Sequence, residues 1–79
     1  MKDTNTALTK CFLAAFPELS EDQVPRASLD TVAGWDSVAT AVLLSLVGEE
    51  FEIDIDFELV ERLTSYGAIY DYLESIRRL

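Results

Sequence analysis

The chain has 79 residues, of which 49% are hydrophobic, and its fifteen acidic and six basic residues give a formal net charge of −9. A chain of this length forms a single domain, residues 1–79, and this apolar fraction is sufficient for a folded core. The negative charge repels phosphate backbones and anionic membrane surfaces, which excludes nucleic acid as an expected partner and favours a basic protein surface.

Cys11 is the only cysteine, and the chain contains no histidine. One cysteine cannot form an intramolecular disulfide, which excludes a disulfide-rich secreted scaffold and favours the reducing cytoplasm. The N-terminal apolar run is short and interrupted by Lys10, unlike a signal peptide, and no run approaches the roughly 18 apolar residues of a membrane span. We therefore expect a cytoplasmic monomer without a membrane span.

The first predicted helix runs from about Thr4 to Phe16. Its apolar residues recur at the spacing of one face of an amphipathic helix, at Leu8, Cys11, Phe12, Ala15 and Phe16. Within this stripe we expect Cys11 to be a buried thiol without a chemical role. Pro17 cannot continue the helix, and residues 17–35 predict a long loop, a feature that is often functional in small domains. Three apolar residues are expected to anchor this loop to the core: Val24, Leu29 and Val32.

The second predicted helix begins at Ser37 and ends near Phe51, and Asp36 and Ser37 are both suited to cap its start. Residues 52–63 predict a loop and then a short third helix. The last helix has an apolar stripe that comprises Tyr66, Ile69, Tyr70, Leu73 and Ile76. These elements predict an all-α fold class: a small four-helix bundle with three main helices, one short helix, and a long loop between helices one and two.

Ser37 has no partner in this chain for nucleophilic chemistry, because a nucleophilic serine needs a nearby base and the chain lacks histidine. Two interpretations are open: Ser37 only caps a helix, or another protein modifies it. Gly34 gives the backbone freedom before the helix, Asp36 places a carboxylate beside the hydroxyl, and the helix start presents N–H groups suited to a phosphate. We propose no catalytic residues and expect no independent enzyme.

The order of these features resembles the acyl carrier proteins over nearly the whole chain. The segment Gly34-Trp35-Asp36-Ser37-Val38 is similar to the family signature, an Asp-Ser pair followed by an apolar residue, usually leucine, at the start of the second helix. Val38 is a mild departure from that signature. The stretch GEEFEIDI and the entry Leu63-Thr64-Ser65 into the last helix also resemble the family in register.

The resemblance implies that Ser37 carries 4′-phosphopantetheine, transferred from coenzyme A by a separate phosphopantetheinyl transferase that provides the magnesium and the base. Asp36 is then the adjacent recognition residue. The thiol of the prosthetic arm would hold acyl groups as thioesters and deliver them to acyl-loading, acyl-transfer or synthase enzymes. The chain would be a carrier without catalytic activity of its own.

The second helix departs from the carriers of bacterial fatty-acid synthesis, which usually have acidic residues at the positions of Ala39 and Val42. If Val38 and Ala41 face the core together with Leu44, Val47 and Phe51, an apolar strip points outward, and it comprises Ala39, Val42 and Leu46, followed by Glu49. Such a strip predicts a partner contact, and greater burial of the helix is the other interpretation. The predicted docking residues are Val38, Ala39, Val42, Leu46, Glu49 and Glu50. A specialised lipid, polyketide or peptide pathway is then at least as plausible as housekeeping fatty-acid synthesis.

Packing between the helices predicts an apolar interior, and the resemblance implies that it shelters an acyl chain. The predicted pocket residues are Leu44, Val47, Ile55, Leu63 and Ile69. Trp35 is expected to pack over the loop with its indole N–H near solvent, and a position beside the arm is also open. The acidic residues between 49 and 58 suggest calcium, but an EF-hand starting at Asp54 finds Leu59 and Ser65 where glycine and glutamate are required. We therefore expect no dedicated metal site, and a docking surface for basic patches instead.

Two alternatives to an acyl carrier remain open. An aminoacyl or peptidyl carrier differs only in its cargo, and Trp35-Asp36 favours acyl cargo because those carriers more often have a neutral context at the serine. An unmodified acidic helical interaction module would use Ser37 only as a cap. It predicts that Ser37→Ala changes helix stability but leaves binding intact.

Overall fold

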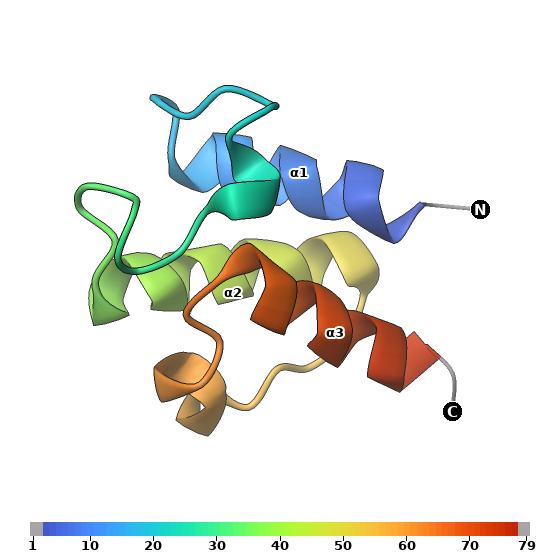
Figure 1. The fold of residues 1–79 in the computed structure, drawn as a ribbon. Coiled ribbons are helices and arrows are strands. Elements are labelled where there is room, and N and C mark those ends of the chain that lie inside the picture. The colour runs from blue at the N-terminus through green and yellow to red at the C-terminus, as the bar shows by residue number, and fades with distance from the viewer. Residues whose placement is uncertain (1–2, 78–79) are drawn as a thin grey trace.

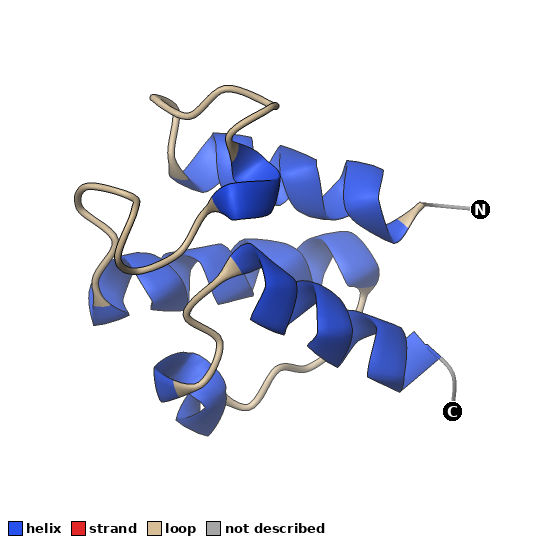
Figure 2. Cartoon of the chain, viewed as in Figure 1, coloured by secondary structure: helices blue, strands red, loops and turns tan. Residues whose placement is uncertain are grey.

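The computed structural model describes residues 3–77, and within them the secondary structure is helical, without a strand (Figures 1 and 2). The three α-helices are α1 (Thr4–Ala15), α2 (Ser37–Phe51) and α3 (Tyr66–Arg77). Two 3-10 helices lie in the connections, η1 (Val24–Arg26) and η2 (Phe57–Glu61). A small, mostly helical fold with three α-helices is therefore confirmed. Within the described residues, no helix is both long enough and apolar enough to cross a bilayer.

Helix α1 begins and ends at residues that local chemistry favours. The carboxylate of Asp3 caps its start by accepting from the Thr6 N–H at 3.3 Å. The last turn ends with the Phe16 N–H donating to the Phe12 carbonyl at 2.8 Å, and Pro17 then prevents continuation. Cys11 lies on the buried face of this helix, as its place in the apolar stripe predicted.

Helix α2 ends at Phe51, and at Glu52 the chain turns back toward Gly48. The Glu52 N–H donates to the Gly48 carbonyl, as does the Ile53 N–H at 3.0 Å. Glu52 has the left-handed conformation common at helix C-termini, with φ 56°. A Cβ at position 48 would lie 3.0 Å from the Ile53 carbonyl oxygen, so glycine allows the chain to fold back this closely.

The core is built where α2 packs against α1 and where α1 packs against α3 (Figure 1). Its largest fully buried side chains are Phe12, Leu8, Leu43, Leu44, Ile69, Leu73, Val24, Val47 and Thr40. Aromatic rings extend this core toward the start of α2: Phe12 lies 5.6 Å from Trp35 in an edge-on arrangement and 5.5 Å from Tyr66 between ring centroids. The aromatic ring of Phe12 therefore packs against Trp35, at the end of the α1–α2 connection.

The connection between α1 and α2 is attached to the start of α3 by backbone hydrogen bonds. The Leu29 N–H donates to the Thr64 carbonyl at 2.8 Å, and the Tyr66 N–H donates to the Ala27 carbonyl at 2.9 Å. Val24 and Ala27 provide the buried side chains, whereas 45% of the Leu29 side chain is exposed. The prediction that the Leu29 side chain anchors this segment is wrong, because residue 29 is held through its backbone.

Candidate functional site

Ser37 is the first residue of α2, and its side chain is exposed. The helix cap is Asp36, whose carboxylate accepts from the Ala39 N–H at 2.9 Å. Among residues 3–77, the Ser37 hydroxyl makes no hydrogen bond. Of the two residues suited to cap the helix, Asp36 therefore does so, and the Ser37 hydroxyl takes no part in holding the described fold together.

Gly34 lies in the turn that directly precedes α2. Its φ of 83° lies in the left-handed region, which side chains other than glycine rarely adopt, and no atom lies within 4 Å of a Cβ built there. Glycine is needed here for its backbone conformation and not for space. The backbone N–H of the adjacent Trp35 donates to the Val32 carbonyl at 3.2 Å, and this bond closes the turn before the helix begins.

Trp35 is buried, with 4% of its surface exposed, so the prediction that its N–H lies near solvent is wrong. The indole N–H donates to Thr40 Oγ1 at 2.6 Å, and that hydroxyl donates to the Asp36 carbonyl at 2.9 Å. The ring also packs against Phe16, with centroids 5.3 Å apart. Burial is possible because Thr40 gives the indole N–H a partner inside the protein.

Thr40 is the residue of this site that the sequence did not indicate. It is 1% exposed and lies on the core side of α2, where Leu43, Leu44 and Val47 continue the same face. The one available signal was a threonine within an otherwise apolar helical run. A single polar residue in such a run does not identify its hydrogen-bond partner, so the link to Trp35 required the structure.

The exposed face of α2 differs from the predicted one at its first turn. Val38 is 71% exposed and Val42 is 51% exposed, so the premise that Val38 faces the core is wrong, whereas both side chains are exposed as docking residues would be. Ala41 is half-buried, as are the predicted docking residues Ala39 and Leu46. The buried face starts at Thr40, which places Val38 on the opposite side of the helix, one turn from Val42. The first two turns of α2 thus carry two exposed valines, of which Val38 directly follows Ser37.

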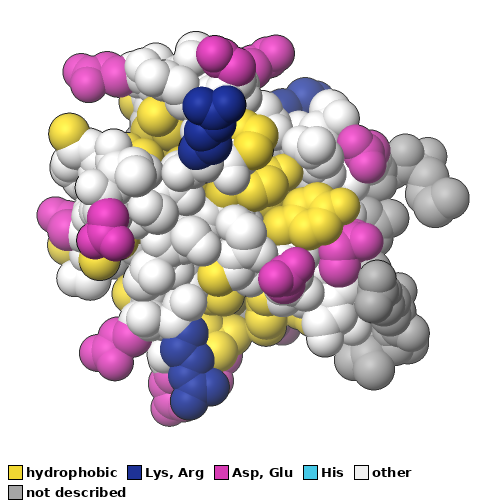
Figure 3. Space-filling view, in the orientation of Figure 1, with side chains coloured by type: hydrophobic (Ala, Val, Ile, Leu, Met, Phe, Trp, Pro, Cys, Tyr) yellow, Lys and Arg dark blue, Asp and Glu magenta, His cyan; other side chains and the backbone are white. Residues whose placement is uncertain are grey.

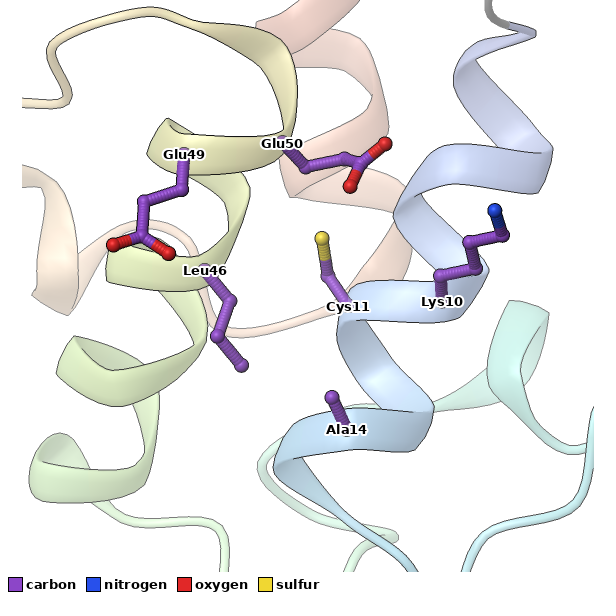
Figure 4. Close-up of a pocket in the computed structure, with 6 residues that line it drawn as sticks. All are labelled: Lys10, Cys11, Ala14, Leu46, Glu49 and Glu50. Carbon is purple, nitrogen blue, oxygen red and sulfur yellow. The ribbon is translucent and has the colours of Figure 1, made fainter.

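The remaining docking residues line a separate hollow of about 340 Å³ between α1 and α2 (Figure 4). Lys10, Cys11 and Ala14 come from α1, and Leu46, Glu49 and Glu50 come from α2. In Figure 4 the Cys11 side chain projects from α1 toward α2. The six predicted docking residues therefore divide between the first half of α2, beside Ser37, and a hollow farther along the helix.

Four of the five predicted pocket residues are buried in the common core: Leu44, Val47, Leu63 and Ile69. Ile55 is half-buried against the same core. Leu44 and Ile55 also line an open hollow of about 380 Å³ beside the end of α2, together with Gly48 and Ile53. The structure thus connects the buried apolar residues to the surface at residues 53–55.

Acidic residues outnumber basic ones in the chain by fifteen to six. On the face shown in Figure 3, apolar side chains gather near the centre, and acidic side chains lie beside this patch and at the edges. Within residues 3–77, no group of three or more His, Cys, Asp or Glu side chains is arranged to hold a metal ion. Neither a protein-family model nor a solved structure matches this chain.

Proposed function

We propose that the chain is an acyl carrier protein in which the Ser37 hydroxyl is the attachment point for 4′-phosphopantetheine. The observation that carries the proposal is an exposed serine hydroxyl at the start of a helix whose cap is a different side chain. A serine that capped α2 would have its oxygen engaged by the backbone. Here Asp36 performs that role, which supports a purpose for Ser37 outside folding.

The start of α2 is chemically suited to a phosphodiester on Ser37. The positive end of α2 favours negative charge; the Asp36 carboxylate caps it through the Ala39 N–H, and the first turn that follows contains no acidic residue that would repel a phosphate. In the transfer, Ser37 Oγ bonds to the phosphorus that carries pantetheine, and the pyrophosphate P–O bond of coenzyme A breaks. The adenosine bisphosphate portion leaves, and the hydroxyl proton passes to a base on the transferase. When attached, the arm supplies a thiol that holds an acyl group as a thioester.

The surface around Ser37 supports docking of partner enzymes on α2. The exposed Val38 and Val42 offer apolar contact within two turns of the modified residue. The wider surface, with a net charge of −9, favours partners with basic patches. The proposed partners are a phosphopantetheinyl transferase and the enzymes that load, transfer or extend acyl groups.

The finer description of the fold belongs to the same proposal. In it, η2 (Phe57–Glu61) takes the place of the short third helix of a four-helix bundle, and the segment between α1 and α2 is the long loop that presents Ser37. The apolar interior that reaches the surface at Ile55 shelters the acyl chain. We place the protein in the cytoplasm as a monomer.

Intact-mass spectrometry after incubation with coenzyme A, Mg²⁺ and a broad-specificity phosphopantetheinyl transferase tests the proposal. We expect the mass to increase by one phosphopantetheine group, and Ser37→Ala to abolish the increase. Ser45→Ala is the matched control, because Ser45 is also an exposed serine of α2. No increase in the wild type, or an increase that survives Ser37→Ala, overturns the assignment.

The exposed valines also favour a second candidate, an unmodified interaction module that binds a partner through α2. It predicts that Ser37→Ala leaves partner binding and biological function intact. An aminoacyl or peptidyl carrier would be modified like an acyl carrier but loaded by an adenylating enzyme. Loading assays on the modified protein separate these cargo classes.

A further inference from the structure

Thr40 donates two hydrogen bonds to the peptide unit that joins Asp36 to Ser37. The carbonyl oxygen of Asp36 accepts from both the backbone N–H and the side-chain hydroxyl of Thr40, each at 2.9 Å. The first bond is present in any helix, whereas the second depends on the threonine side chain. Because this carbonyl belongs to the peptide unit preceding Ser37, the Thr40 hydroxyl helps to fix the position of Ser37.

The same hydroxyl links this peptide unit to the core. Thr40 Oγ1 accepts from the Trp35 indole N–H at 2.6 Å. The Trp35 ring in turn packs against Phe12, which lies in α1, and Phe16, which caps the C-terminus of α1. Thr40 and Trp35 are both almost fully buried. Removing the Thr40 oxygen leaves the indole N–H without this acceptor in a buried position, which favours movement of Trp35 and of the turn around it.

We infer that Thr40 and Trp35 are positioning residues for modification of Ser37: they hold the Gly34–Ser37 turn in the conformation that the transferase binds. This inference rests on the proposed function of Ser37. If the turn leaves that conformation for part of the time, the apparent affinity for the transferase falls in proportion to the competent fraction. Bound molecules still react at the same rate. The expected signature is therefore a higher KM with an unchanged kcat.

The main test uses Thr40→Val, which removes the hydroxyl and nearly conserves the side-chain shape. From the usual size of a hydrogen bond, we expect KM for phosphopantetheine transfer to rise by up to about tenfold, with kcat unchanged. In a ¹⁵N-labelled sample the resonance of the Trp35 indole N–H shifts, because its acceptor is lost. Trp35 is the only tryptophan, so the resonance is assigned without ambiguity. Thr40→Ser keeps the oxygen and restores both values.

Thr4→Val is the matched control for loss of a buried threonine hydroxyl. Thr4 is 3% exposed, and its hydroxyl donates to Glu74 Oε2 at 2.8 Å. It lies at the start of α1, whereas Ser37 starts α2 at the opposite side of the molecule (Figure 1). We expect Thr4→Val to lower the unfolding temperature without changing KM or the Trp35 resonance. A general loss of stability is thereby separated from loss of positioning.

Trp35→Phe provides a second variant if Thr40→Val does not fold, as judged by circular dichroism. Phenylalanine retains an aromatic ring against Phe12 but has no N–H, so KM is again expected to rise. A wild type that is modified normally, with KM unchanged in whichever of the two variants folds, overturns the inference and leaves the proposed function standing. A wild type that is not modified at all overturns the proposed function, and the inference with it.

Discussion

Replacing Asp36 and Ser37 separately by alanine measures which of them stabilises α2. The Asp36 carboxylate accepts from the Ala39 N–H at 2.9 Å, whereas the Ser37 hydroxyl has no partner among the described residues. Loss of a helix N-cap costs about 1 kcal/mol, within a range of roughly 0.5–2 kcal/mol. For a domain of this size, about 1 kcal/mol lowers the midpoint of thermal unfolding by roughly 4–8 °C.

We therefore expect Asp36→Ala to lower the unfolding midpoint by several degrees, while Ser37→Ala leaves it unchanged or raises it slightly, since alanine has the better helix propensity. Asp36→Asn is the control, because asparagine caps helices about as well as aspartate. Thermal unfolding followed by circular dichroism, with urea titration to obtain free energies, gives the comparison. If Ser37→Ala were as destabilising as Asp36→Ala, the serine would be part of the cap and the argument for its availability would fail.

Three further outcomes are expected. Val42→Glu places a charge at the exposed Val42 and should impair acyl transfer with the natural partner. Binding of the wild type to that partner should weaken only modestly as salt is added, because salt does not screen apolar burial. Equal transfer rates for wild type and variant across a salt series would show that the strip is not used. Burial raises the pKa of the Tyr66 phenol above its usual 10.0. The neutral phenol therefore contributes stability that is fully present below pH 10.0, the pKa of the unfolded chain. This contribution is lost as the pH rises through the higher pKa of the folded state. Urea titrations from about pH 8 to 11 should therefore show a smaller alkaline loss of unfolding free energy in Tyr66→Phe than in the wild type; parallel curves would contradict this. An octanoyl group on the arm should shift the amide resonances of the pocket residues relative to the thiol form, and unchanged spectra would show that the chain stays outside; the residues to follow are Leu44, Val47, Ile55, Leu63 and Ile69.

The helices were predictable because their ends carry strong local signals. Pro17 ends the first helix, and the structure stops it at Ala15, one residue before the expected end. Asp36 and Ser37 located the start of α2, which begins at Ser37 and extends to Phe51 as expected. The stripe of the last helix also marked its buried side, since Ile69 and Leu73 are almost completely inaccessible.

The orientation of α2 was not predictable from its sequence. Apolar residues occupy nearly every position from Val38 to Val47, so no polar face indicates which side is buried. In the structure, α2 packs against α1 with Leu43 and Leu44 buried and Val38 exposed to solvent. The Trp35–Thr40 bond escaped prediction for a related reason: it joins a turn to a helix, where neither helical nor strand periodicity relates two residues.

The burial of Cys11 has a practical consequence for chemical labelling. This side chain is the only thiol of the polypeptide, and it lies in the core with 5% of its surface exposed. Thiol reagents react with accessible thiolates, so a maleimide should modify Cys11 only slowly while the protein stays folded. A phosphopantetheine arm on Ser37 would end in a solvent-accessible thiol. Fast labelling of the native protein would then report the arm, and the labelling that appears only in denaturant would report the polypeptide.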